Sequence, residues 1–237
     1  MKNFSLVVPV FNEKDNLLIL IEDIVNSGTY DSIDEIIFVN DCSTDGSHEI
    51  LQKISAKYKK SVILNEDVNK GQSNAILTGI SNAKSENIIT IDADGQNPPS
   101  EILGMINFYN DFNKPILLAG IRLKRKDKLI KVMSSKIANK VRNIILGDDC
   151  PDTGCSLKIF RKKDFIQLPF FNGIHRFLPA LFQFNKIEVI YREVSHKERL
   201  YGVSKYGTID RLIKTLYDLF FVLKIKKPII KKNDTIY

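Results

Sequence analysis

The sequence predicts a single Rossmann-like α/β domain, in which helices flank a mixed, mostly parallel sheet. Three observations support this fold: the chain has 237 residues, 43% of them are hydrophobic, and short apolar runs alternate with amphipathic segments through its first half. That length and apolar content suffice for one large domain with a buried core. Alternating strands and helices favour parallel strands with right-handed crossovers, and ligands bind such sheets at the carboxyl ends of the strands.

The first half shows a regular succession of elements. Short runs of β-branched and other apolar residues predict strands, and apolar residues at a spacing of three or four predict helices. Pro98-Pro99-Ser100-Glu101 is typical of a helix start. The expected strands are Phe4–Val8, Glu35–Val39, Val62–Leu64, Asn87–Ile91 and Ile116–Ala119; the expected helices are Glu13–Asn26, one from the turn at 41–46 to about Tyr58, one from the polar loop 69–73 to Ala83, and one from Pro98 to Phe112.

The second half is less regular and contains no internal repeat. We expect a basic helix over Lys128–Leu146, a strand pair over Thr153–Phe160, a strand over Glu188–Val194 and a helix over Tyr206–Ile225. We therefore expect residues 1–205 to form the main domain. Residues 206–237 are expected to form a C-terminal amphipathic helix with a basic tail.

The net charge of +7 hides an asymmetry between the two halves of the chain. Residues 1–121 hold 9 basic and 17 acidic residues, a net of −8, which leaves 26 basic and 11 acidic residues, a net of +15, for 122–237. A basic half faces nucleic acid, a phosphorylated substrate or a membrane surface, and composition alone does not choose among them.

The remaining compositional features point to the cytoplasm. No run of eighteen apolar residues predicts a transmembrane helix, and the N-terminus lacks the pattern of a signal peptide. The three cysteines, Cys42, Cys150 and Cys155, lack metal-site spacing and fit buried thiols in a reducing compartment.

A pair of aspartates follows the apolar run 88–91, at Asp92 and Asp94, with Gln96 two residues further on. In an extended segment, side chains at positions i and i+2 point to the same side, so these three converge. Carboxylate and amide oxygens suit a hard cation such as Mg²⁺ or Mn²⁺, which neutralises charge on a departing diphosphate. An ordinary Asp-rich turn has the same sequence, and D-x-D alone is a weak motif.

Two further polar segments end the first and second predicted strands. They are Pro9-Val10-Phe11-Asn12-Glu13 and Asn40-Asp41-Cys42-Ser43-Thr44-Asp45-Gly46. Each has a purely structural interpretation, because Asn12 suits a helix cap and Asp45-Gly46 suits a turn. The functional interpretation gains weight because all three segments end strands and would face one crevice.

Together these motifs resemble the family-two inverting glycosyltransferases, which have the A-type nucleotide-sugar-binding fold. The resemblance rests on P-x-F-N-E, N-D-x-S-T-D-G and D-A-D-G-Q-x-P-P in that order, and it covers roughly residues 4–220. More narrowly, the chain is similar to dolichol-phosphate mannosyltransferases and bacterial polyprenyl-phosphate glycosyltransferases. That similarity rests on residues 92–99 (DADGQNPP), 152–158 (DTGCSLK), 175–180 (HRFLPA) and 199–206 (RLYGVSKY).

The resemblance implies an activity and a set of site residues. The activity is metal-dependent transfer of a sugar, with inversion, from GDP-mannose or a UDP-sugar to dolichyl or undecaprenyl phosphate, with residues 1–205 as the catalytic domain. The implied residues are Pro9, Phe11, Glu13, Asp41 and Asp92 for the nucleotide; Asp92, Asp94 and Gln96 for Mg²⁺ or Mn²⁺; Lys131, Ser135, Arg199, Ser204 and Lys205 for the acceptor and its phosphate; and Asp92, Asp94, Arg122, Arg199 and Lys205 for catalysis.

Two positions depart from the pattern of the family. Asn40 stands where the family usually has a second aspartate, and Lys131 stands where an arginine often precedes Ser135 by four residues. Lysine keeps the positive charge but lacks the planar fork that grips two phosphate oxygens. The acceptor-phosphate site is therefore less well defined by the sequence than the metal site.

Attachment to a membrane is expected to be peripheral, on the cytoplasmic face. Residues 122–142 hold nine basic residues and one acidic residue, which suits either a solvated helix face or a surface beside anionic lipid. The helix expected over Tyr206–Ile225 is amphipathic and is followed by lysines, which favours an interfacial helix. Packing of its apolar face on the core of the protein is the alternative.

Three other functions compete with lipid glycosylation. A glycosyltransferase of the same fold could act on a glycan or another non-lipid acceptor in cell-surface polysaccharide synthesis. A nucleic-acid-binding module predicts aromatic residues within the basic run, and residues 122–142 contain none. A catalytically silent scaffold is disfavoured by the intact Asp92, Asp94 and Gln96.

Overall fold

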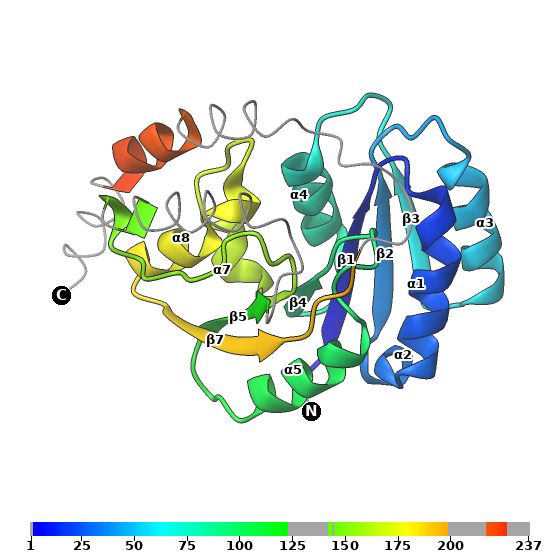
Figure 1. Cartoon of the computed structure of the whole chain (residues 1–237), viewed down its shortest axis with the longest axis horizontal. Helices are drawn as coiled ribbons and strands as arrows, with labels where there is room; N and C mark the ends of the chain where they lie inside the picture. Colours follow the sequence, from blue (N-terminus) through cyan, green and yellow to red (C-terminus); the bar gives the residue numbers. More distant parts are fainter. Residues whose placement is uncertain (1, 123–141, 144, 199–216, 227–237) are drawn as a thin grey trace.

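The computed structural model describes residues 2–122, 142–143, 145–198 and 217–226, and these form a sheet covered by helices on both faces (Figure 1). The sheet of the described residues has seven strands in the order β3-β2-β1-β4-β6-β5-β7. The strands are β1 Phe4–Val10, β2 Glu35–Asn40, β3 Ser61–Asn65, β4 Asn87–Thr90, β5 Ile116–Arg122, β6 Lys158–Arg161 and β7 Glu188–Val194.

All strands but β6 run in the same direction. β1 pairs in parallel with β2 and β4, β2 with β3, and β5 with β7, whereas β6 is antiparallel to both β4 and β5. Ile159 of β6 lies opposite Ile89 on one side and Leu118 on the other. The expected mixed, mostly parallel sheet is therefore confirmed.

Helices cover both faces of the sheet. They are α1 Lys14–Asn26, α2 Thr29–Ser32, α3 Ser47–Lys57, α4 Gln72–Asn82, α5 Ser100–Asn110, α7 Lys162–Ile166 and α8 Leu178–Phe184, together with the 3-10 helix η1 Ile174–Arg176 and the helical residues 217–226.

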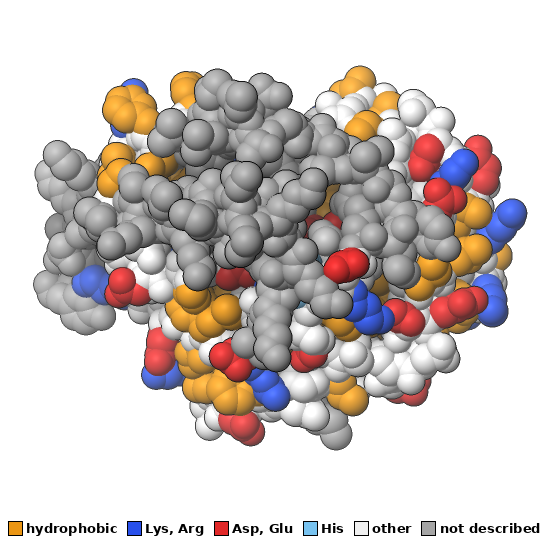
Figure 2. Space-filling view, in the orientation of Figure 1, with side chains coloured by type: hydrophobic (Ala, Val, Ile, Leu, Met, Phe, Trp, Pro, Cys, Tyr) orange, Lys and Arg blue, Asp and Glu red, His pale blue; other side chains and the backbone are white. Residues whose placement is uncertain are grey.

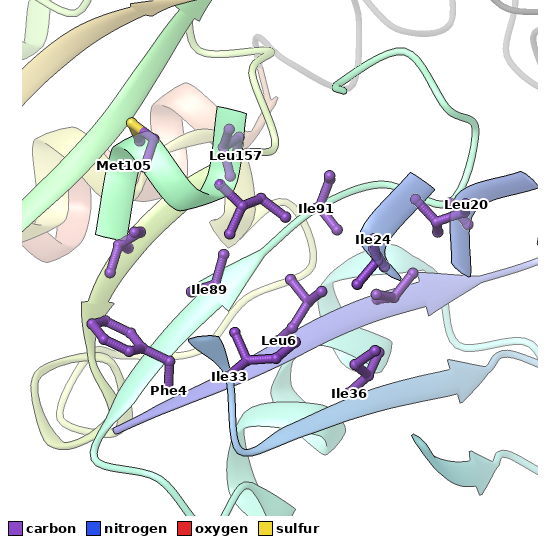
Figure 3. Packing of buried hydrophobic residues seen from close by; sticks show 14 of the residues in the cluster. Phe4, Leu6, Leu20, Ile24, Ile33, Ile36, Ile89, Ile91, Met105 and Leu157 are labelled. Atoms are coloured by element: carbon purple, nitrogen blue, oxygen red, sulfur yellow. The ribbon is translucent and has the colours of Figure 1, made fainter. Parts of the chain in front are cut away.

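Alternation along the strands divides the core into two layers. Leu6 and Val8 of β1 join a cluster with residues of α1, α3 and α5, whereas Val7 joins a second cluster with residues of α4, α7, α8 and helix 217–226. Figure 3 shows the first layer, in which Leu6, Ile89 and Ile24 lie among other fully buried side chains. Successive side chains of a strand point to opposite faces, so central strands buried on both faces must be apolar throughout.

Helix α4 lies unusually close to β1 because of Gly79. A β-carbon at this position would lie 2.5 Å from Val7 Cγ1 and 3.1 Å from Val39 Cγ2. Real carbon atoms do not approach this closely, so any side chain here forces the helix away from the sheet. The close packing fixes α4, whose first residues lie beside the carboxyl ends of the strands.

Most of the expected elements are confirmed, and one is wrong. All five strands and all four helices expected in the first half are present, as is the strand over Glu188–Val194. The strand pair expected over Thr153–Phe160 is instead a single strand, β6, because the Asp152 carboxylate organises residues 152–154 as a turn. Helices α2, α7 and α8 and helix η1 were not expected, and most of the expected helix Lys128–Leu146 lies outside the described residues.

We predict that Gly79→Ala lowers the free energy of unfolding by about 1–3 kcal/mol, because overpacking a stiff valine outweighs the gain in helix propensity. Urea unfolding followed by circular dichroism measures the change. Gly104→Ala in α5 is the matched control, since its β-carbon would meet only the Arg192 guanidinium, at 3.5 Å. The control should be neutral or up to about 1 kcal/mol more stable; equal effects of both substitutions would contradict the packing argument.

Candidate active site

Three polar segments meet at the carboxyl edge of the sheet, because β2, β1 and β4 are neighbours. Asp41 follows β2 directly, and its backbone N–H donates to Val10 O of β1 at 2.8 Å. Ile91, just after β4, donates its N–H to Val7 O at 3.2 Å. The ladders therefore bring the ends of these strands together at one edge of the sheet.

The segment after β1 is tied to the segment after β2. Asn12, with a φ of 52°, accepts the Thr44 N–H on Oδ1 at 2.8 Å and donates its own N–H to Ser43 Oγ at 3.0 Å. The Glu13 N–H donates to Ser47 Oγ at 3.0 Å. Pro9 and Phe11, predicted to line the nucleotide pocket, are half-buried, whereas Glu13 is buried and accepts a bond from Asn16.

Asp41 is buried and binds the backbone of the loop before α4. Its Oδ1 accepts the Lys70 N–H and its Oδ2 accepts the Gly71 N–H, each at 2.8 Å. A carboxylate that accepts two backbone N–H groups forms strong, charge-assisted bonds. Asp41, predicted to contact the nucleoside, thus also holds residues 70–71 against the end of β2.

The first two residues of α4, which follow that loop, contact other parts of the site. Gln72 donates from Nε2 to Asp92 Oδ1 at 2.7 Å. The Ser73 hydroxyl lies 2.7 Å from His175 Nδ1 and accepts the Gly173 N–H at 2.8 Å. Three consecutive residues, 71 to 73, therefore link the ends of β2 and β4 to η1.

Ser156, just before β6, supports Asp92 from the opposite side. Its Oγ accepts the Asp92 N–H at 3.0 Å and Asn97 Nδ2 at 2.9 Å, and its carbonyl accepts the Thr90 hydroxyl at 2.6 Å. The Gln96 N–H donates to Asp94 Oδ1 at 3.1 Å, which fixes the turn after the aspartates. The backbone on both sides of Asp92 is therefore held by side chains.

Asp92 and Asp94 are like-charged neighbours, and each disfavours ionisation of the other. Burial, and then the negative charge of Asp94, raise the pKa of Asp92 to about 7, against the lowering effects of Ser156, Lys158 and Arg122. A bound cation would relieve both contributions, because it replaces lost hydration and offsets the repulsion. The ionised forms of Asp92 and Asp94, the two residues predicted to bind a metal, are thus unfavourable next to one another.

The oxygen ligands at this point fit a magnesium-like ion. Among the described residues no group of three or more His, Cys, Asp and Glu side chains is placed to hold a metal. Mg²⁺ does not require such a cage, because it keeps several waters and binds through one or two carboxylates plus substrate phosphates. Asp92, Asp94 and the neighbouring Gln96 supply that kind of donor set.

Arg122, at the end of β5, is held by Asp152. Its Nε and Nη2 donate to the two carboxylate oxygens of Asp152 at 2.7 and 2.8 Å, and its backbone N–H donates to Oδ2 at 3.2 Å. The forked pair orients the guanidinium and raises the pKa of Arg122 against the lowering effect of burial. Its positive charge acts on Asp92, so the predicted phosphate-binding arginine is part of the same electrostatic site.

The predicted acceptor residues lie outside the described part of the chain; they are Lys131, Ser135, Arg199, Ser204 and Lys205.

Sequence reasoning gave no role to several residues that the structure places in the site. Gln72 and Ser73 had one visible signal, the polar run 69–73 that opens a helix. Asp152, Ser156 and His175 lie in segments that carry the narrower resemblance, but the resemblance gave them no individual role. The residues with contacts in the site that were not predicted are Gln72, Ser73, Asp152, Ser156 and His175.

The family follows from residues 5–168, which match Glycosyl transferase family 2. This region covers more than half of the chain and includes all three strand-end segments. The chain therefore belongs to the family-two glycosyl transferases, as the sequence motifs predicted.

Curated relatives are similar over nearly the whole chain. The undecaprenyl-phosphate 4-deoxy-4-formamido-L-arabinose transferase of Pectobacterium carotovorum is 33% identical over 227 residues, covering 94% of this chain and 68% of the relative. The protein of the same name from Proteus mirabilis is 32% identical over 223 residues, covering 92% of this chain and 67% of the relative.

Solved structures show the same A-type fold at low identity. Glucosyl-3-phosphoglycerate synthase from Mycobacterium tuberculosis, in complex with Mn²⁺, UDP and glucosyl-3-phosphoglycerate, superposes with a TM-score of 0.70 at 14% identity, over 92% of this chain and 80% of that one. The mannosyltransferase PcManGT from Pyrobaculum calidifontis, in complex with GDP-Man and Mn²⁺, superposes with a TM-score of 0.64 at 16% identity, over 90% of this chain and 60% of that one.

We predict that Asp41→Asn weakens nucleotide binding and lowers the free energy of unfolding by about 1–3 kcal/mol. The new amide group must point its N–H₂ at one of two backbone N–H donors, which leaves a buried group unpaired. Calorimetric titration with UDP or GDP and chemical unfolding measure the two effects. The exposed Asp67→Asn, in the same loop, is the control; an Asp41→Asn protein that behaves like this control would show that the carboxylate does not hold the loop.

Proposed function

We propose that this protein transfers a sugar from a nucleotide-sugar to a polyprenyl phosphate, with inversion at the anomeric carbon. The observation that carries the proposal is the convergence of the three strand-end segments, with Gln72 bonded to Asp92 and the 70–71 backbone bonded to Asp41. The named activity of the relatives, transfer onto undecaprenyl phosphate, supports a lipid acceptor for a chain similar to them over 94% of its length.

On the donor side, we assign Pro9, Phe11, Glu13 and Asp41 to the nucleoside and the Asp92 region to the diphosphate. Asp92, Asp94 and Gln96 would hold Mg²⁺ or Mn²⁺, and the ion, when bound, neutralises charge on the leaving diphosphate. The Mn²⁺ in the structures of the fold neighbours supports this choice of ion. Arg122, fixed by Asp152, adds a positive charge to the same region.

On the acceptor side, the chemistry requires positioning more than deprotonation. A phosphomonoester has a second pKa of about 6, so a polyprenyl phosphate is already an anionic nucleophile near neutral pH. One phosphate oxygen forms a bond to the anomeric carbon while the bond from that carbon to the donor diphosphate breaks, and the nucleoside diphosphate leaves. The protein aligns the two anions and keeps their charges apart from one another.

The acceptor phosphate is assigned to Lys131, Ser135, Arg199, Ser204 and Lys205, the basic and hydroxyl side chains of the second half. A lipid acceptor places the enzyme at a membrane surface, and in the described residues no helix is long and apolar enough to cross one. We assign a peripheral contact with the anionic cytoplasmic face of the membrane to the residues of this chain. The basic second half of the chain has the charge that this contact needs.

Helix 217–226 offers a surface for that contact. Leu219 and Val222 are buried in the second core layer, so the packing alternative holds for one side of this helix. On the other side Tyr217 and Phe220 are 74% and 59% exposed, and Lys224 Nζ lies 4.8 Å from the centre of the Phe220 ring. Hydrophobic side chains are visible in Figure 2 where Figure 1 places this helix, at the upper left. Aromatic rings beside a lysine suit the interface of an anionic bilayer.

The first experiment is a panel of GDP- and UDP-sugars with Mg²⁺ or Mn²⁺, with and without a short polyprenyl phosphate. Nucleotide release that requires both the metal and the lipid, with a sugar-phospholipid product, is the expected result. Release with a glycan or a small phosphorylated acceptor in place of the lipid would overturn the lipid assignment and leave the donor site standing.

We predict that Asp94→Ala reduces metal-dependent transfer roughly 100-fold or more, because it removes a metal ligand and its charge from beside the diphosphate. The measurement is the initial rate at saturating donor over a titration of Mn²⁺. Asp31→Ala, at an exposed aspartate of α2, is the control and should keep the wild-type rate. Full metal-dependent activity of Asp94→Ala would remove this residue from the site.

We predict that Tyr217→Ser with Phe220→Ser weakens binding to vesicles of mixed zwitterionic and anionic phospholipid by about tenfold or more, because two aromatic contacts with the interface are lost. Sedimentation with vesicles measures the partition. The control is Leu18→Ser, an apolar residue on α1 that is 43% exposed. Equal binding by the aromatic double variant and the control would exclude this surface as the membrane contact.

A further inference from the structure

Gln72 bonds to the carboxylate of Asp92, although no sequence motif assigns it a role. Its Nε2 lies 2.7 Å from Asp92 Oδ1, a short, charge-assisted bond between the first residue of α4 and the residue that follows β4 by two positions. The Asp92 backbone N–H is held separately by Ser156 Oγ at 3.0 Å. Oδ1 of Asp92 therefore has a protein donor, which favours one orientation of the carboxylate.

The backbone at Gln72 is anchored on both sides. On the N-terminal side, the Gly71 N–H donates to the buried Asp41 carboxylate at 2.8 Å. On the C-terminal side, Ser73 is fully buried, accepts the Gly173 N–H at 2.8 Å and lies 2.7 Å from His175 Nδ1. Because Gln72 stands between these two anchors, its backbone is held where its side chain reaches Asp92.

The second anchor is itself held by the C-terminal helix. Arg176 Nη2 lies 2.5 Å from Asp218 Oδ2, and both residues are largely buried. Gly173 has a φ of 129°, and a β-carbon there would overlap the Asp218 carboxylate. Helix η1 is thus clamped between α4 and helix 217–226, so Ser73 rests on a rigid partner.

We propose that Gln72 is a positioning residue for the cation site, acting through Asp92, and that Ser73 holds Gln72 in place. The Gln72 amide binds Oδ1 and would thereby orient the Asp92 carboxylate for a cation that Asp92 and Asp94 would hold together. A ligating carboxylate is usually oriented by a hydrogen-bond donor of this kind, and loss of the donor weakens metal binding roughly 10- to 100-fold. The inference rests on the proposed function only in its use of a divalent cation, and not on the lipid acceptor.

The test is Mn²⁺ affinity of the full chain in the presence of UDP or GDP, measured from the paramagnetic resonance of free Mn²⁺. Gln72→Met keeps the length of the side chain and removes the donor, so Mn²⁺ affinity should fall roughly 10- to 100-fold. Transfer should then recover at high Mn²⁺, which a merely structural defect would not allow. Gln52→Met, at an exposed glutamine of α3, is the matched control.

Two further variants keep the proposal testable if Gln72→Met fails to fold. Gln72→Asn keeps an amide but withdraws it by one methylene group, and should lose Mn²⁺ affinity in the same way. Ser73→Ala should lose affinity in the same direction, because it releases the first turn of α4. Folded Gln72 variants with Mn²⁺ affinity within twofold of the wild type would overturn the proposal, as would a wild-type protein that binds no Mn²⁺.

These results separate the inference from the proposed function. A wild-type protein that binds Mn²⁺ with nucleotide but uses no polyprenyl phosphate would refute the lipid acceptor. The shift in Mn²⁺ affinity on replacing Gln72 would still support the positioning role.

Discussion

The arrangement of the site depends on the buried carboxylate of Asp41. Its two oxygens bind the backbone N–H groups of Lys70 and Gly71, and this holds the start of α4 against the end of β2. Without that constraint, Gln72 would have no fixed position from which to reach Asp92. Burying a carboxylate is costly unless its oxygens are satisfied, and here that cost is offset by organising the loop between β3 and α4.

Unlike the Asp41 carboxylate, which two backbone N–H groups stabilise, the Asp92 carboxylate is destabilised by its surroundings. Burial, and then the negative charge of Asp94, raise the pKa of Asp92 to about 7, so the ionised pair is destabilised without a cation. Asp92 and Asp94 belong to a first half with a net charge of −8, whereas the second half carries +15. For the function that we propose, this division of charge would suit two phosphate-bearing substrates, because a cation at the acidic residues would serve one anion and basic side chains would serve the other.

The sequence predicted the strand ends well and the connections between them poorly. Asp92 and Asp94 could be found because a period of two and an apolar strand are local features. The bond between Arg122 and Asp152 joins residues thirty positions apart, and no local pattern reports it. The strand pair expected over Thr153–Phe160 is wrong because the Asp152 carboxylate accepts the nearby Gly154 N–H, which favours a turn, and because Arg122 binds the same carboxylate.

The C-terminal helix shows why amphipathic pattern alone left two alternatives open. Leu219 and Val222 pack on the core while Phe220 faces outward, so the helix has two apolar sides with different partners. Asp218, on the packed side, pairs with Arg176 and thereby clamps η1 against Ser73. A helix that meets lipid on one side and η1 on the other would hold the acceptor membrane at a fixed place relative to Gln72 and Asp92. In the function that we propose, this packing would position the two substrates relative to one another.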